Sequence, residues 1–328
     1  MSAMQSIDFS RIPRFADLPI KKGAPPESSW GVFGDDDELG CLNFLTPEAV
    51  VEAAAAVAYG RAFRLDAPIN YADPPLFNRA PARHTIVSFE RFGLLGHDDS
   101  LDAYNTQEGS QWDGLCHVGH VTHRKFYNGV TADQIQDGPH GKLGIHRWAD
   151  RLVGRGVLID VRKFTEERGR AIDPLTDTAY SLDDLVGALD AQRTTLKPGS
   201  IVLVRTGWIA AYRGSSAEAK RAMAPLHALR ACGIEASSRL VGWLWDHRVA
   251  AIATDSPAVE PWPWSFQDEG ALHFRALSLL GLPLGEQFVL DELAADCARD
   301  GRYEFLLTSA PLHLEGGVAS PPNALAIK

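Results

Sequence analysis

Cysteine is scarce in this sequence, and basic residues are outnumbered by acidic ones. The first deficit argues against disulfide-rich and zinc-ribbon proteins, and the second against nucleic-acid-binding proteins. The chain has four cysteines, none of them in a CxxC pair, so we expect neither a zinc ribbon nor a disulfide framework, and a reducing cytoplasm fits best. Its 32 lysines and arginines face 42 aspartates and glutamates, which gives a formal net charge of -10. Sequence-independent binding of nucleic acid needs clustered basic residues, so we expect no nucleic-acid partner.

Long apolar runs and several common catalytic motifs are also missing. No segment approaches the roughly 20 apolar residues of a membrane span, and the opening MSAMQSIDFSRIPRF lacks the apolar stretch of a signal peptide. The sequence has no GxGxxG, Walker-type, GxSxG or HExxH motif, so dinucleotide, nucleotide, serine-hydrolase and HExxH metalloprotease functions lack their usual signals. We expect a cytoplasmic protein that has no membrane contact and acts on a small molecule.

The sequence does contain an alternation of strand and helix patterns. Apolar runs rich in β-branched residues predict strands in HTIVSFERFG, GRGVLIDV, GSIVLVRTGW, VAAIATD and YEFLLTSAPL. Helices are predicted after an N-cap at Thr46, after a Ser181 and Asp184 capping pair, in SAEAKRAMAPLHALR, and in VLDELAADCARDG up to Gly301. This alternation predicts a mixed α/β fold, and without a repeat or Gly/Ser linker we expect a single domain of residues 1–328. Residues 1–40, rich in Pro, Gly and Asp, are predicted to form an irregular N-terminal arm.

Chemistry-bearing side chains gather in one short run, EGSQWDGLCHVGH, and just before it. In an extended segment Gln107, Gln111, Asp113 and His117 point to one face, because an even number of positions separates each pair. A turn at Gly114 would aim them at one point. On local sequence alone an ordinary polar turn explains the same residues.

A second group lies late in the chain, where His273 precedes Glu286 in LHFRALSLLGLPLGEQFVLDEL and Asp255 ends an apolar run. Acid and imidazole groups can jointly hold a divalent cation or exchange protons with a substrate. A structural histidine and a helix-capping acid are the alternatives for His273 and Glu286. Trp112 and Phe126 are candidates for an aromatic substrate pocket, with core packing as the alternative.

The run from Gln107 to His117 resembles the signature of the cyclase-like hydrolases, a family that includes bacterial kynurenine formamidase and isatin hydrolase. That signature is His-x-Gly-Thr-His-x-Asp-x-Pro-x-His, in which the first two histidines and the aspartate bind a divalent metal and the last histidine is catalytic. Gly109, Asp113 and His117 match it, and Ser110 replaces the threonine. WGVFGDDDELGCLNFLTPEAV, PGSIVLVRTGW, ATDSPAVEP and GGVASPPNALAI extend the resemblance over most of the chain.

The resemblance implies a swivelling β/β/α fold with a mixed sheet flanked by helices, assembly into homodimers or homotetramers, and hydrolysis of a small-molecule amide or lactone. It implies that His117 is a general acid/base and that Asp113 is its partner or a metal ligand. It also makes His273 and Glu286 the counterparts of a later histidine and glutamate that complete the family's metal or catalytic site.

Two departures from the signature concern the metal, because both metal-binding histidines are replaced, by Gln107 and Gln111. A neutral amide oxygen is a weak, hard donor, which disfavours zinc and makes manganese or magnesium the better candidate, held by Asp113, Gln111, His273 and Glu286. A site without metal is an equal alternative, with the amide groups of Gln107 and Gln111 binding substrate. A hydrolase, a metal-independent lyase or cyclase, and a non-catalytic small-molecule binding protein therefore remain open.

Overall fold

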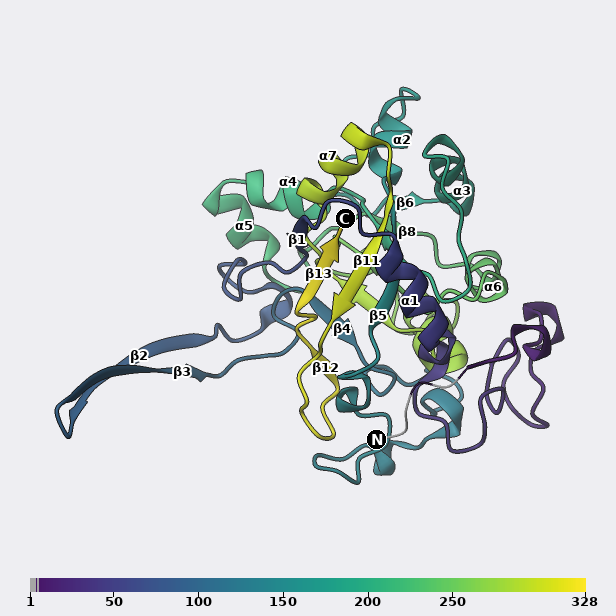
Figure 1. Ribbon diagram of the computed structural model, residues 1–328, viewed down its shortest axis with the longest axis horizontal. Coiled ribbons are helices and arrows are strands. Elements are labelled where there is room, and N and C mark those ends of the chain that lie inside the picture. Colours follow the sequence, from purple (N-terminus) through teal and green to yellow (C-terminus); the bar gives the residue numbers. More distant parts are fainter. Residues whose placement is uncertain (1–3, 5) are drawn as a thin grey trace.

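A nine-stranded mixed sheet forms the centre of the molecule in the computed structural model, which describes residue 4 and residues 6–328 (Figure 1). The strand order is β1-β13-β11-β5-β7-β9-β10-β4-β12. Four neighbouring strands run parallel to one another: β5 (Val153–Ile159), β7 (Ile201–Val204), β9 (Ala251–Thr254) and β10 (Leu284–Glu286). Antiparallel strands complete the sheet on both sides: β1 (Ala62–Arg64), β13 (Ala324–Ile327), β11 (Glu304–Ser309), β4 (Gln111–Asp113) and β12 (Ala319–Ser320).

The parallel strands read as continuous apolar runs because both faces of the sheet are covered. Every residue of β7 and of β9 is buried, as expected for parallel strands between layers of helices. At Gly156 in β5, an added Cβ would lie 2.1 Å from the ring of Phe305 on β11. Because Gly156 has no side chain, the Phe305 ring can lie over β5, and β5 and β11 pack closely.

Helices flank this sheet, and the predicted mixed α/β fold is confirmed. The predicted helices appear as α1 (Pro47–Ala55), α3 (Leu182–Ala191), α5 (Ala217–Met223) and α7 (Asp291–Asp300). The helix expected over SAEAKRAMAPLHALR ends at Met223, with Ala224 as its C-cap, because Pro225 has no N–H to continue the hydrogen bonds of the helix. The other α-helices are α2 (Val161–Glu166), α4 (Trp208–Gly214) and α6 (Ser238–Asp246), and a π-helix, η8, spans Phe274–Leu280.

Shorter elements connect these layers. A separate two-stranded sheet pairs β6 (Ala179–Tyr180) with β8 (Gly233–Ile234). In the part of the N-terminal segment that the structure describes, 3₁₀ helices precede α1 at Phe9–Arg11, Phe15–Asp17 and Gly40–Phe44. Positions 1–3 and 5 of the predicted N-terminal arm lie outside the described residues, and the single-domain boundary stays a prediction. Among the residues described, no helix is both long and apolar enough to cross a membrane.

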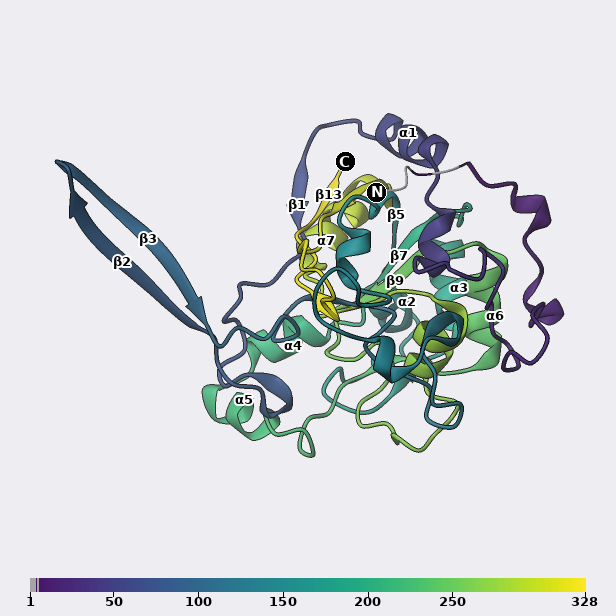
Figure 2. The ribbon, with the colours of Figure 1, turned by 90° about the horizontal axis from the view of Figure 1, so that it is seen from below.

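The run HTIVSFERFG forms a strand, but outside the main sheet. It is β2 (Arg83–Arg91), which pairs over nine residues with β3 (Leu94–Asp102). The resulting hairpin projects far from the body of the molecule (Figures 1 and 2). Its residues are mostly exposed, so an apolar strand pattern here does not mark a strand of the core.

The predicted capping pair at the start of α3 is present. The Ser181 hydroxyl accepts from the Asp184 N–H, and the Asp184 carboxylate accepts from the N–H and hydroxyl of Ser181. Replacing Ser181 by alanine is expected to lower the free energy of unfolding by about 1 kcal/mol, because it removes an N-cap acceptor. Urea denaturation of the Ser181→Ala variant measures the loss, and a variant as stable as the wild type would contradict the assignment.

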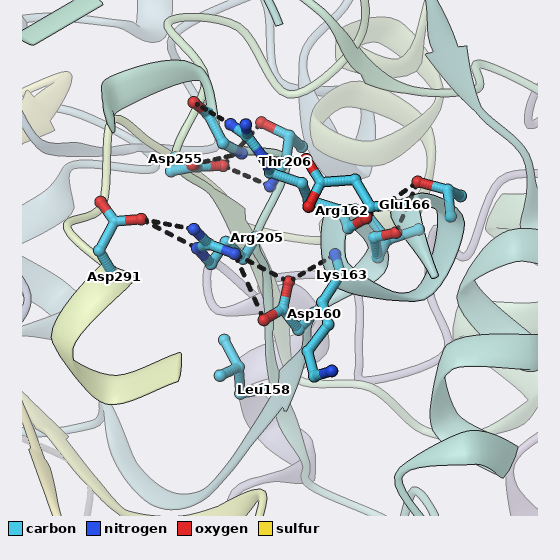
Figure 3. Close-up of polar contacts among 12 residues, drawn as sticks. Leu158, Asp160, Arg162, Lys163, Glu166, Arg205, Thr206, Asp255 and Asp291 are labelled. Carbon is cyan, nitrogen blue, oxygen red and sulfur yellow. Dashed lines mark hydrogen bonds and ion pairs between the residues drawn. The ribbon is translucent and has the colours of Figure 1, made fainter. Parts of the chain in front are cut away.

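A polar network lies at the carboxyl ends of β5, β7 and β9 (Figure 3). Arg205 bridges Asp160 at 3.1 Å and Asp291 at 2.9 Å. Next to it, the carboxylate of the fully buried Asp255 accepts from the N–H groups of Thr206 and Gly207 at 2.6 and 2.7 Å. Burial nevertheless dominates and raises the pKa of Asp255 to about 6 from 3.8.

The raised pKa of Asp255 predicts a pH dependence of stability. The folded state binds this proton more tightly than the unfolded state, so the stabilising contribution is present below pH 3.8 and is lost as the pH rises through about 6. The loss amounts to about 3 kcal/mol in total. We expect the difference in unfolding free energy between wild type and Asp255→Asn to fall from pH 5 to pH 7 in urea titrations. A difference that is constant or grows over that interval would contradict the account.

Candidate active site

The candidate site is built where the short strand β4 pairs with β10. Glu286 lies opposite Gln111, and Leu284 lies opposite Asp113. Because side chains two apart on a strand share a face, and directly opposite residues share it too, Gln111, Asp113 and Glu286 point together. The Gln111 amide donates to Glu286 at 2.8 Å and to Asp113 at 3.1 Å.

Gln107 and His117 join this group from the segments that flank β4. The Gln107 amide donates to Asp113 at 3.1 Å and lies 3.2 Å from Nδ1 of His117. His117 Nε2 is 3.8 Å from Asp113 Oδ1. The backbone N–H of His117 donates to the carbonyl of Gly114 across a turn. The structure therefore brings together the side chains that the alternation pattern placed on one face.

His273 enters from the far side of Asp113, immediately before η8. Its Nδ1 lies 2.8 Å from Glu260, and its Nε2 lies 3.4 Å from Glu286 and 3.9 Å from Asp113 Oδ2. His117 and His273 thus approach Asp113 from two sides, with ring centroids 6.2 Å apart. The indole of Trp264 stacks on His273 with ring centroids 5.5 Å apart.

Three carboxyl groups, those of Asp113, Glu260 and Glu286, lie close to the buried His273 and favour its protonated form. Burial alone would lower the pKa of His273, but the charges and hydrogen bonds of Glu260 and Glu286 outweigh it and raise that pKa well above its usual value. Burial, and next the charge of Asp113, raise the pKa of Glu286. The acidic surroundings therefore favour the imidazolium form of His273.

His117 lies in a different environment from His273. Burial lowers its pKa, and the charge of Asp113 opposes that shift only in part. The lowered pKa favours the neutral imidazole, which is the form that accepts a proton. The site therefore holds two histidines of opposite character on either side of one aspartate, a separation typical of acid and base roles.

The sequence pattern did not single out Glu260 or Arg79. Glu260 lies after β9, close to Asp255 in the sequence, and the signal that could have found it is the need of a buried histidine for a carboxylate partner. Arg79 is part-buried, donates to the carbonyl of Gln107, and its charge acts on Glu286 and Asp113. Burial lowers the pKa of Arg79. It adds a positive charge to an otherwise acidic site.

Ser110, which replaces the signature threonine, holds the segment before β4 in place. Its hydroxyl donates to the carbonyl of Gln287 at 2.6 Å and accepts from the N–H of Ala67 at 2.8 Å. The Gln287 amide in turn donates to the carbonyl of Gly109, and the hydroxyl of Tyr71 donates to Gln287. These bonds fix the backbone from which Gln107 and Gln111 project.

The donor set fits a divalent cation in two respects. Ligand atoms of Asp113, His117 and His273 lie within 4.8 Å of one another. Two buried oxygens of the site, Asp113 Oδ2 and Gln111 Oε1, have no hydrogen-bond partner among the described residues, and a buried polar atom of this kind calls for a ligand or water. Compared with the set predicted from sequence, His117 joins the cluster, while Glu286 instead binds the Gln111 amide.

Three further residues were candidates for the site. Trp112 is on the opposite face of β4 from Gln111 and Asp113, where its buried indole donates to Ser309 and packs on Phe288; the structure places it in the core rather than toward a substrate. The ring of Phe126 packs against Gly119. The carboxylate of Asp255 is taken up by Thr206 and Gly207 and does not join Asp113.

The pairing of imidazoles with carboxylates beside β4 and β10 defines an acid–base or metal site of the kind that enzymes use. The family model named Cyclase, described as Putative cyclase, matches residues 61–261. A crystal structure described as a novel cyclase is 33% identical, with a TM-score of 0.81, and the match covers 92% of this chain and 99% of that one. The chain belongs to this cyclase family.

More distant structures share the fold. Isatin hydrolase A from Labrenzia aggregata, bound to benzyl benzoate, is 18% identical with a TM-score of 0.54, over 84% of this chain and 94% of that one. Isatin hydrolase A from Ralstonia solanacearum is 16% identical with a TM-score of 0.52, over 86% of this chain and 97% of that one. No curated protein matches the sequence.

Proposed function

We propose that this protein is a hydrolase that opens an amide or lactone of a small molecule. The observation that carries the proposal is the placement of His117 and His273 on two sides of Asp113, at 3.8 and 3.9 Å. A carbonyl compound between the two rings would have a proton acceptor on one side and a proton donor on the other. Membership of the cyclase family supports the same chemistry.

In the proposed reaction His117 takes a proton from the water that attacks the carbonyl carbon. A C–O bond forms, and the carbonyl oxygen becomes an oxyanion that amide N–H groups such as those of Gln107 can stabilise. The C–N bond of an amide, or the C–O bond of a lactone, then breaks as His273 gives its proton to the leaving atom. Glu260 orients His273 through Nδ1. The sum is addition of one water, and proton exchange with solvent restores both histidines.

A divalent cation would be held by Asp113, His117 and His273, with the unpaired amide oxygen of Gln111 as a further donor. When bound, it supplies Lewis-acid polarisation of the substrate carbonyl. Only one of the signature's three metal-binding positions keeps its ligand, Asp113, and the amide oxygen of Gln111 is a hard donor, so an ion such as manganese or magnesium is the better candidate than zinc. A cation also has to displace the proton of His273, so binding should weaken as the pH falls.

One observation favours a second candidate, a metal-independent lyase or cyclase. The amide nitrogens of Gln107 and Gln111 both donate to Asp113 Oδ1, each at 3.1 Å. These bonds engage the oxygen that faces His117 and hold the aspartate in the absence of any ion. In such an enzyme His117 and His273 would move protons without a hydrolytic water.

Aromatic side chains around His273 support an aromatic substrate. Trp264 stacks on the His273 ring and makes edge contacts with Trp262, Phe266 and Phe274. An aromatic ring inserted beside them gains offset or edge-on contacts. Two proteins of the same fold are named isatin hydrolases, so isatin is a suitable first probe.

The experiment is incubation of the purified protein with a panel of aryl amides, cyclic amides including isatin, and aryl lactones, followed by mass spectrometry. A product that gains the mass of one water supports the hydrolase. Turnover without that gain supports the lyase or cyclase, and saturable binding without turnover supports a binding protein and overturns the proposal. The same assays with EDTA, and after metal analysis of the untreated protein, separate the metal-assisted from the metal-independent mechanism.

A further inference from the structure

The guanidinium of Arg79 lies beside the candidate site without an ion-pair partner, and we propose that it binds a carboxylate group of the substrate. The inference rests on the proposed function, because it assigns a substrate class to the same site: aromatic amides or lactones that carry a carboxylate. Arg79 precedes β2, and its side chain donates to the carbonyl of Gln107. Its charge also acts on the imidazole of His117.

The guanidinium of Arg79 has binding capacity that the protein does not use. It offers several N–H donors in a planar fork, yet among the residues that the structure describes it makes one hydrogen bond, to Gln107, and no ion pair. The charges of Glu286, Asp113 and Glu108 act on it from a distance. A part-buried cation without a paired anion is costly, so the open side of the fork is suited to an anionic ligand.

The backbone immediately before Arg79 is strained. Phe77 and Asn78 have φ of 62° and 59°, which lies in the left-handed region that is unfavourable for residues with a Cβ. Strained residues persist where the surrounding structure holds them, and they are concentrated at ligand-binding sites. This turn places the Phe77 ring against Arg79, with the guanidinium carbon 5.0 Å from the ring centroid.

A row of aromatic side chains connects Arg79 to the proton donor of the proposed reaction. Phe77 makes an edge contact with Trp262, with ring centroids 5.1 Å apart. Trp262 contacts Trp264, and Trp264 stacks on His273. An aromatic ring that lies along this row gains edge or offset contacts. It then has a guanidinium at one end and a reacting imidazole at the other, which suits an aromatic acid whose amide or lactone bond lies away from the carboxylate.

A carboxylate matches Arg79 better than the other anions that arginine binds. The guanidinium fork pairs with a carboxylate through two parallel hydrogen bonds. A phosphate monoester fits the same fork but carries nearly two negative charges at neutral pH, and the nearby Asp113 and Glu108 repel it more strongly. The oxyanion of the reaction forms only transiently, so it does not explain a cation that is unpaired before the substrate binds.

Binding of benzoate and benzamide tests the proposal without requiring turnover, because the two probes have similar shapes and only benzoate is charged. In isothermal titration we expect the wild type to bind benzoate about 10- to 100-fold more tightly than benzamide, the range expected for hydrogen bonds to a charged group. Arg79→Gln keeps an amide donor for the Gln107 carbonyl and should lose the preference for benzoate. Arg79→Lys keeps the charge but not the fork, and should retain part of the preference.

The matched control is Arg83→Gln, which removes an exposed arginine on β2 and should keep the wild-type preference. Titrations with and without EDTA show whether a bound cation supplies the preference instead. The proposal is overturned by a wild type that binds benzoate no more tightly than benzamide, by a preference that disappears in EDTA, or by tighter binding of phenyl phosphate than of benzoate. It is also overturned if Arg79→Gln keeps the preference or, where that variant does not fold, if Arg79→Lys binds benzoate as tightly as the wild type.

The same titrations separate this role of Arg79 from the hydrolase reaction. A preference for benzoate in a protein that turns over no amide or lactone would refute the reaction and leave the carboxylate site standing. Hydrolysis of a neutral amide by a protein without that preference would refute the role of Arg79 and leave the reaction standing.

Discussion

Replacing His117 by alanine is expected to lower kcat by about 100- to 10,000-fold, the range typical of a lost general acid/base. The imidazole lies 3.8 Å from Asp113 and within reach of the Gln107 amide, so alanine leaves the scaffold of β4 in place but removes the proton acceptor. Steady-state kinetics with an amide or lactone that the wild-type protein hydrolyses gives the measurement. We expect KM to change much less than kcat.

Two controls separate this effect from misfolding. His227→Ala removes an exposed imidazole and should retain wild-type kcat, and the Tm of His117→Ala should stay close to that of the wild type. Wild-type turnover by His117→Ala would remove His117 from the mechanism. If the variant lost both kcat and bound metal, His117 would instead be assigned as a ligand of the cation.

Restoring histidine at both signature positions, Gln107→His/Gln111→His, is expected to raise the affinity for zinc by at least about 100-fold. Both side chains already point at Asp113, and each substitution replaces a neutral amide with an imidazole, which zinc prefers. Isothermal titration with zinc at pH 7.5 measures the affinity. Gln267→His, at an exposed position, is the matched control and should leave it unchanged.

The double variant also addresses why the glutamines are there. If the site is metal-independent, added histidines should lower turnover in EDTA, because Asp113 loses the two amide donors that hold it. Zinc affinity that stays at the wild-type level would show that the ligand geometry of this site differs from that of a metal centre, and would count against the metal-assisted mechanism.

The site was predictable where local periodicity decides the geometry. Because strand side chains alternate, Gln111 and Asp113 share a face of β4 as expected, whereas Gln107 and His117 reach the same point from the turns that flank the strand. The same alternation places Trp112 on the other face, so its assignment to a substrate pocket overlooked the rule that located its neighbours. The capping pair at Ser181 was likewise local and is present.

Long-range pairing was beyond the sequence. Glu260 and His273 meet only because the segment after β9 folds back beside the start of η8, and nothing in the pattern of either segment specifies that partner. The strand at 84–93 was recognisable from its β-branched residues. Whether such a strand joins the main sheet depends on long-range pairing, and in the structure it pairs with β3 instead.

Hydrolysis in water enriched in ¹⁸O tests the central claim most directly. The account predicts that the wild-type protein converts an amide or lactone of the panel into an acid that carries one ¹⁸O atom in its new carboxyl group. His117→Ala should form that product far more slowly. A product without ¹⁸O, or no product from any substrate that the protein is shown to bind, would contradict the assignment of this site to a hydrolase.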